Sequence, residues 1–223
     1  MRKHKTIKGE CYHLFNITNT PEPIFRDDVD RARFLYLIVH LQSSIIFNHL
    51  SRPLPYFLEH ATFKTSEYTS RAITEARYVE LISFTLMPNH FDLVVRETKE
   101  GGIPYFMQRV QNAYTKYWNT KYRRRGHLFR GPYHYEIVAT KEQLSHLSAH
   151  LHLKPRELPE WRGKEEKYPW SSFQDFSKNR WGTLLAHEHI TDTFKDEKVY
   201  RKFVLHPSQK TRRAILGESH FFT

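Results

Sequence analysis

The stretch that decides the fold is YVELISFTLMPNHFDLVVRE, residues 78 to 97. Its two halves, Tyr78–Met87 and His90–Glu97, are rich in β-branched, aromatic and leucine side chains, which predicts two strands. Pro88-Asn89 between them predicts a tight turn. The stretch is therefore expected to form an antiparallel hairpin at the centre of the chain.

On both sides of this hairpin the sequence alternates between strand-like and helical patterns. The predicted elements are a strand at Tyr12–Thr18, a helix at Arg26–Asn48 capped by Asp27 or Asp28, the hairpin, a helix from Pro104 to about Tyr122, a strand at Tyr133–Ala139 and a helix at Lys141–Leu153. This order predicts an α+β fold, a ferredoxin-like split βαβ antiparallel sheet with helices on one face.

The domain organisation follows from the breaks in these patterns. We expect residues 1–155 to form the ferredoxin-like domain. Within it, Ser51–Arg77 has two prolines and no clean period, which favours a loop or insertion with at most a short helix. Residues 156–223 are expected to form a C-terminal helical extension packed on the domain, with helical patterns at Gly182–His189 and Lys195–Leu205.

The composition is that of a folded protein in a reducing compartment. Of the 223 residues, 39% are hydrophobic and 15% aromatic, too many for a disordered chain. No run approaches the roughly 18 apolar residues of a spanning helix, and no apolar stretch follows Met1–Glu10 as in a signal peptide. The single cysteine, Cys11, cannot form an intramolecular disulfide. We therefore expect a cytoplasmic protein without a membrane partner.

The charge distribution points to a polyanion. The formal net charge is +11, and Gly101–Tyr135 contains no Asp or Glu. Its cations are Arg109, Lys116, Lys121, Arg123, Arg124, Arg125 and Arg130. Aromatic residues such as Tyr114 and Tyr117 lie between them, and cations beside flat rings are typical of single-strand recognition. The alternative is that the aromatic residues are core and the cations a solvated face.

A pair of polar residues on the second hairpin strand could carry chemistry. Alternate residues of a strand face the same way, so His90 and Asp92 project an imidazole and a carboxylate into one space. Such a pair suits Mg²⁺ or Mn²⁺ when a third ligand joins it. The alternative is a simple His–Asp hydrogen bond at the sheet edge.

Several ordered motifs resemble a known family. They are MPNHFDLVV (87–95), GGIPYFMQRVQNAYTKYWNTKYRRRGHLFRGPY (101–133) and EQLSHLSAHLHLKP (142–155), with YHLFNIT (12–18) and YPWSSFQDF (168–176) at either end. Together they resemble the IS200-like, single-tyrosine HUH transposases, most of all the branch called REP-associated tyrosine transposases. The similarity runs from Tyr12 to about Val204 and excludes Ser51–Arg77.

The resemblance implies a single-strand DNA endonuclease and strand transferase that recognises hairpin DNA. In the family a His-hydrophobic-His pair holds a divalent metal, and a tyrosine on the helix after the last strand attacks the phosphate. Here His90 matches the first histidine and Asp92 replaces the second, an oxygen ligand that can hold Mg²⁺ or Mn²⁺. His150 stands at the nucleophile position. Lys154 stands at the family's asparagine position one turn later, where a cation repels a metal.

These substitutions leave the activity open. In the favoured interpretation the protein binds single-stranded or hairpin DNA through Arg109–Arg130, while tyrosine-dependent cleavage is impaired or lost. In a second, the site still cuts, with His150 as nucleophile, or with His90, Asp92 and His152 activating water, and Lys154 as the cation facing the phosphate. In a third, the scaffold is an RNA-binding regulatory module. The resemblance also allows a homodimer, because family members differ in oligomeric state.

Overall fold

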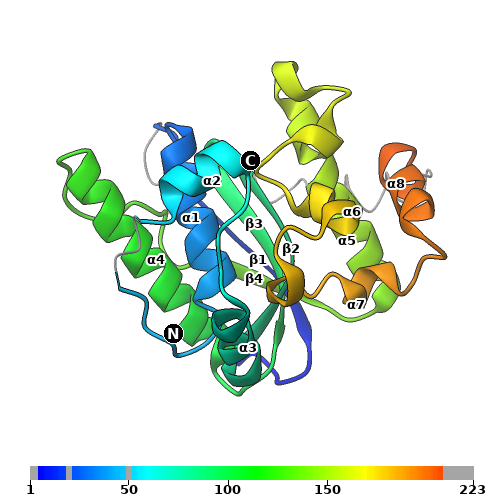
Figure 1. Cartoon of the computed structure of the whole chain (residues 1–223), viewed down its shortest axis with the longest axis horizontal. Coiled ribbons are helices and arrows are strands. Elements are labelled where there is room, and N and C mark those ends of the chain that lie inside the picture. The colour runs from blue at the N-terminus through cyan, green and yellow to red at the C-terminus, as the bar shows by residue number, and fades with distance from the viewer. Residues whose placement is uncertain (1–4, 19–21, 49–51, 208–223) are drawn as a thin grey trace.

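The computed structural model describes residues 5–18, 22–48 and 52–207. Its centre is an antiparallel sheet with the strand order β2-β3-β1-β4 (Figure 1). The strands are β1 (Cys11–Ile17), β2 (Val79–Met87), β3 (His90–Glu97) and β4 (His134–Val138). The predicted α+β class, the hairpin and the split βαβ order are confirmed.

One face of the sheet is covered by α1 (Asp28–His40) and α4 (Gly102–Lys121). The helix α1 begins at the predicted cap, where the Asp27 carboxylate accepts a hydrogen bond from the backbone N–H of Asp30. The helix α4 approaches the hairpin closely at Gly102, where a Cβ atom would lie 2.3 Å from the carbonyl oxygen of Tyr78. Only glycine fits there.

The opposite face is covered by α5 (Lys141–Leu153) and the C-terminal segment. Ile82 and Val94 of the sheet pack against α5 and against the short helices α6 (Asp175–Lys178), α7 (Glu188–Thr191) and α8 (Glu197–Leu205). Figure 1 shows the sheet between these two helical layers. The prediction placed the helices on one face. It holds for α1 and α4, whereas α5 follows an edge strand and packs on the other side.

The C-terminal segment also closes the β2 edge of the sheet. The backbone N–H of Leu86 donates to the carbonyl of Trp170, and that of Ala186 donates to the carbonyl of Leu81. These hydrogen bonds satisfy backbone groups that an edge strand would otherwise expose. The connecting 3₁₀ turns lie at Lys154–Glu157, Pro159–Trp161, Glu165–Lys167, Ser172–Gln174 and Gly182–Leu184.

The first helix ends earlier than its apolar pattern predicts, at His40 instead of Asn48. The side chain of Gln42 explains the difference, because it donates to the carbonyls of Val39 and Leu184 and accepts from the N–H of Leu81. These bonds tie the chain to β2 and leave the following apolar residues outside the helix. Such non-local hydrogen bonds override helical periodicity.

Residues 52–77, expected as a loop or insertion, contain two helices, α2 (Leu54–His60) and α3 (Glu67–Ala76). The helix α2 packs against α1 through Leu54 and Phe57, and α3 contributes the fully buried Ile73 to the same core. The helix α2 buries only Leu54 and Phe57, and α3 buries only Ile73, so neither shows a clear apolar period in a short window of sequence. In the described part of the chain, no helix combines the length and apolarity needed to span a membrane.

Candidate functional site

Four polar side chains meet on the face of the sheet that α5 covers. His90 and Asp92 stand at alternate positions of β3, and Phe15 of β1 pairs with Asp92, which brings His13 alongside. Lys154 comes from the helix that packs on this face, because it lies at the C-terminal end of α5. The structure therefore joins the His-Asp pair seen in the sequence with one residue from β1 and one from α5.

Asp92 is the centre of these four. Together with His150, which interacts with their charges, they form what we call the ion cluster (His13, His90, Asp92, His150 and Lys154). The ammonium of Lys154 donates to Oδ2 of Asp92 at 2.7 Å, and Nε2 of His13 lies 2.9 Å from Oδ1. Nε2 of His90 lies 3.4 Å from Oδ2. The side chains of Asp92 and Lys154 are 0% and 4% exposed. The carboxylate is thus fully engaged by protein groups.

Burial sets the charge states in the cluster. Burial alone raises the pKa of Asp92, but the charge of Lys154 and the hydrogen bond with His13 outweigh it and hold that pKa well below its usual range. Burial lowers the pKa of His90 to about 4 and, helped by the charge of Lys154, that of His150 to about 3. At neutral pH these two imidazoles are uncharged. The Asp92 and Lys154 charges cancel each other.

The metal expected at His90 and Asp92 does not fit this arrangement. Both carboxylate oxygens of Asp92 already have partners, and one of these partners is a buried cation. Among the described residues, no group of three or more His, Cys, Asp or Glu side chains is placed to hold a metal ion. Lys154 also faces the carboxylate, so it is not the free cation toward a phosphate that the second interpretation requires.

His152 belongs to a different environment from His150. Its Nε2 lies 2.8 Å from Oγ of Ser172 and 3.1 Å from Oγ of Ser83, and its Nδ1 lies 2.7 Å from the hydroxyl of Tyr200. The ring is fully buried and stacks on Phe173. These contacts correct the idea that His152 activates water together with His90 and Asp92: it is a hydrogen-bonded core residue.

Two of the predicted DNA-binding cations already bind groups of the protein itself. The guanidinium of Arg109 donates to the carbonyls of Leu41, Ser43 and Ile45, which lie just beyond the end of α1. The ammonium of Lys121 binds the carboxylates of Asp27 and Asp30 at 2.7 and 2.8 Å. Both cations join α4 to α1, and their role in DNA binding stays a prediction.

The two tyrosines proposed as stacking platforms are also corrected. Tyr114 is 0% exposed, and its hydroxyl donates to the carbonyl of Ile24 at 2.6 Å. The hydroxyl of Tyr117 donates to Asp30 at 2.8 Å. Their spacing on α4 turns them toward α1 and the core, so the alternative of aromatic core residues applies to both.

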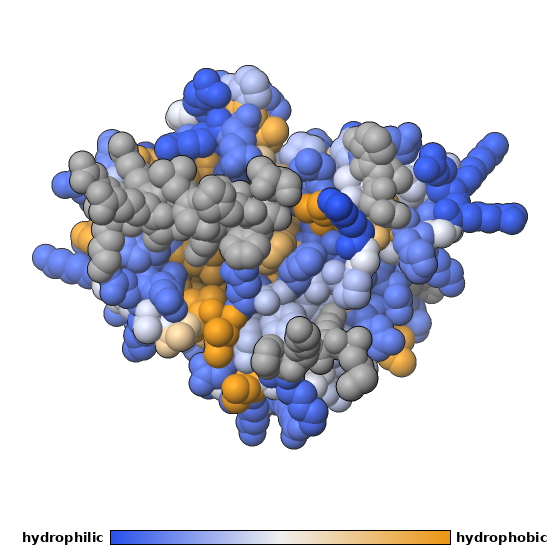
Figure 2. Space-filling view, turned by 180° about the vertical axis from the view of Figure 1, so that it is seen from behind, coloured by the Kyte–Doolittle hydropathy of each residue, from blue (hydrophilic) through white to orange (hydrophobic). Residues whose placement is uncertain are grey.

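The remaining predicted cations stay on the surface. Lys116, Arg123, Arg124, Arg125 and Arg130 are exposed. Among the described residues, Arg124 forms a long ion pair of 3.9 Å with the half-exposed Glu22. Figure 2 shows a mostly hydrophilic surface, with long side chains projecting at its right edge, which is the left edge of Figure 1, where α4 ends.

The arginines sit on a defined connection between α4 and β4. Asn119 holds its start, because its side chain donates to the carbonyl of Gly126 and its own carbonyl accepts from the N–H of Arg124. Further on, the N–H of Arg130 donates to the carbonyl of Ile17, the residue that pairs with His90. The connection therefore reaches the end of the sheet at which the ion cluster begins.

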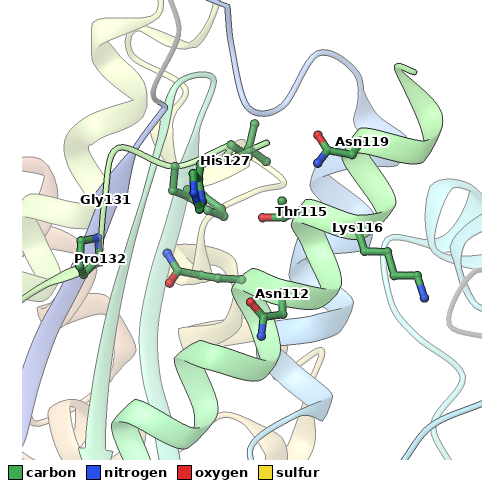
Figure 3. Close-up of a pocket in the computed structure, with 10 residues that line it drawn as sticks. Asn112, Thr115, Lys116, Asn119, His127, Gly131 and Pro132 are labelled. Carbon is green, nitrogen blue, oxygen red and sulfur yellow. The ribbon is translucent and has the colours of Figure 1, made fainter. Parts of the chain in front are cut away.

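A cavity of about 710 Å³ opens between this connection and α4 (Figure 3). Its polar lining consists of Gln111, Asn112, Thr115, Lys116, Asn119 and His127, and its apolar lining of Leu128, Phe129 and Pro132, with Gly131. In Figure 3 the labelled side chains of α4 lie across from His127 and Pro132, while Lys116 extends away from them. The lining contains no acidic residue.

The sequence alone did not single out His13 or the amide side chains of the cavity. The only local sign of a role for His13 was that a histidine stood inside an apolar strand. Its partner Asp92 lies 79 residues away in the sequence. The amides Gln111, Asn112 and Asn119 recur on one face of α4, a polar periodicity opposite the apolar one. A polar face of this kind is compatible with exposure to solvent and with binding of a ligand, and the sequence does not distinguish the two.

Comparison with known proteins finds a distant structural likeness and no match in sequence. No family model and no curated protein matches the chain. Among solved structures, one that matches is described as "Structure of the REP associates tyrosine transposase bound to a REP hairpin". It shares 12% sequence identity and a TM-score of 0.49, and the match covers 83% of this chain and 90% of that chain.

Proposed function

We propose that this protein binds single-stranded or hairpin DNA through the outer face of α4 and the connection that follows it, and that it has lost the tyrosine-dependent cleavage of the transposases its motifs resemble. The observation that carries the proposal is the set of exposed cations, Lys116, Arg123–Arg125 and Arg130, around a cavity without acidic residues. Cations that release counterions from phosphates supply most sequence-independent affinity for nucleic acids.

The cavity adds a means of selecting unpaired bases. Gln111, Asn112 and Asn119 offer amide donors and acceptors, which suit the edges of bases, while the exposed Pro132 offers an apolar surface for a ring. A base inside a duplex cannot present its edge in a side pocket, whereas an unpaired one can. Binding should therefore favour single strands, loops and bulges over plain duplex.

The ion cluster supports the loss of cleavage. The nucleophile position is occupied by His150, an imidazole that cannot form a phosphotyrosine link. Lys154 and Asp92 cancel each other's charge, so the cluster offers little electrostatic stabilisation to a phosphate in a transition state. We therefore propose that the α4 surface keeps its function of binding nucleic acid, while the ion cluster has lost the function of cleavage.

Fluorescence anisotropy with labelled oligonucleotides tests the proposal. We expect a DNA hairpin with a single-stranded flank to bind at least about tenfold more tightly than a perfect duplex of equal length, with affinity falling steeply as salt rises. A matched RNA hairpin, measured in the same way, tests the alternative of an RNA-binding regulatory module. Equal or tighter binding of RNA would favour the regulatory RNA module, and no binding of either would overturn the proposal.

A further inference from the structure

The buried pair of Lys154 and Asp92 raises the question of which cation belongs to this centre. A divalent metal bound by Asp92 would have to lie about 2.0–2.6 Å from a carboxylate oxygen. The ammonium nitrogen of Lys154 already lies 2.7 Å from Oδ2, and Oδ1 is held by His13 at 2.9 Å. A metal and the ammonium would compete for the same space beside one carboxylate.

The position of Lys154 is fixed by the fold. Its backbone N–H donates to the carbonyl of His150 as the cap of α5, so the side chain leaves the helix at its C-terminal end. The partial negative charge of a helix C-terminus favours a cation at this point. The side chain is 4% exposed, which leaves it little freedom to swing toward solvent.

Charge also opposes the presence of both cations. Two positive charges a few ångströms apart repel strongly where water is excluded. Asp92 balances the ammonium of Lys154. Even with Glu157, whose carboxylate also interacts with the charges of Lys154 and Asp92, two carboxylates cannot balance an ammonium and a divalent ion together.

We infer that Lys154 is the resident cation of this centre, standing in the place of a divalent metal ion, and that the centre is complete without a metal. The cation is covalently part of the chain, so the centre needs no loading and a chelator cannot empty it. The inference concerns the ion cluster alone and does not depend on nucleic-acid binding by the α4 surface.

The test is a titration of chelator-treated full-length protein with Mn²⁺, followed by electron paramagnetic resonance of the free ion. Wild-type protein is expected to bind no stoichiometric Mn²⁺. Lys154→Asn removes the ammonium and offers an amide oxygen beside Asp92. It should therefore bind one Mn²⁺ at least about tenfold more tightly than the wild type, because the repulsion is gone and an oxygen ligand is added.

Two variants serve as controls. Lys164→Asn makes the same change at an exposed lysine and should leave Mn²⁺ binding at the wild-type level. Asp92→Asn/Lys154→Asn removes the carboxylate as well and should abolish the binding gained by Lys154→Asn. Stoichiometric Mn²⁺ binding by the wild type that disappears in Asp92→Asn would overturn the inference, and so would a folded Lys154→Asn protein that binds no Mn²⁺.

A stability measurement covers the case in which Lys154→Asn folds poorly. The melting temperature of the wild type should be the same in EDTA and in excess Mn²⁺, because no ion adds to the native state. A rise with Mn²⁺ that is lost in Asp92→Asn would show a metal at the cluster and contradict the inference. For Lys154→Asn, a rise in melting temperature with Mn²⁺ supports it, since the metal then replaces the missing cation.

Discussion

The ammonium of Lys154 donates a 2.7 Å hydrogen bond to Oδ2 of Asp92 across 62 residues of sequence, and both side chains are buried. This contact connects the end of α5 with β3 and places a cation where the motif resemblance implies a metal. It also explains how the charged side chain of Asp92 can be buried between the sheet and α5. A buried carboxylate needs such a partner, because the cost of burying a lone charge is several kcal/mol.

We predict that breaking this pair from one side is costly and that removing it from both sides is not. Lys154→Met should lower the free energy of unfolding by about 3–5 kcal/mol, because it leaves Asp92 buried without its cation. Asp92→Asn/Lys154→Met should recover most of that loss. Urea unfolding at pH 7 measures both values. A loss below about 1 kcal/mol in the single variant would show that the pair is not buried as described.

A second prediction concerns acid. Burial lowers the pKa of His40 and His90 to about 4 and of His150 and His152 to about 3, against about 6.5 for an unfolded histidine. Between these values the unfolded chain binds more protons than the folded one. The free energy of unfolding should therefore fall as pH drops from 6.5 to 4.

The slope of that fall is measurable by urea unfolding at a series of pH values. Each histidine that takes up a proton on unfolding contributes about 1.4 kcal/mol per pH unit. NMR titration of the histidine ring protons supplies the independent check. Rings that titrate near pH 6.5 in the folded protein, together with a flat stability profile, would contradict the assignment.

The third prediction separates surface arginines from a structural one. Replacing Arg123, Arg124 and Arg125 by Gln should weaken hairpin binding and reduce the slope of log affinity against log salt by about 2–3, since each phosphate contact contributes about 0.7–0.9. Stability should change little. Arg109→Gln is the matched control, and it should lower stability while leaving the salt slope unchanged, because Arg109 binds backbone carbonyls. An unaltered slope in the triple variant would remove the α4 surface as the binding site.

The fourth prediction tests the cavity through Gln111. Its Nε2 atom is buried and has no hydrogen-bond partner among the described residues, a condition that costs about 1–3 kcal/mol. Gln111→Leu should therefore leave stability equal or raise it, while weakening the binding of an oligonucleotide with an unpaired base. Anisotropy and thermal unfolding on the same sample give both readouts. Lower stability with unchanged affinity would mean that the amide serves the fold.

The fifth prediction concerns cleavage. Wild-type protein incubated with hairpin DNA and Mn²⁺ should produce neither nicked strands nor a covalent adduct, because the resemblance puts His150 at the position of the family's tyrosine and our inference puts Lys154 at that of its metal. Denaturing gels with end-labelled DNA detect both products. Nicking that disappears in His150→Ala would restore the interpretation of an active nuclease.

Some of this molecule could be predicted from local sequence patterns. The hairpin around Pro88-Asn89, the split βαβ order and the cap of α1 depend on neighbouring residues, so alternation, turns and capping signals were enough to find them. The same is true of the shared face of His90 and Asp92, which follows from the two-residue period of a strand. The acid-free basic stretch is likewise a property of the sequence itself.

Only the tertiary structure decided which of these residues are available for function. Arg109 and Arg125 are alike in sequence, yet one binds backbone carbonyls at the end of α1 and the other is exposed. Lys154 meets Asp92, and His13 joins them, through contacts between elements far apart in the chain. Burial and charge pairing arise from such non-local contacts, and they determine whether a cation meets a carboxylate inside the protein or a phosphate outside it.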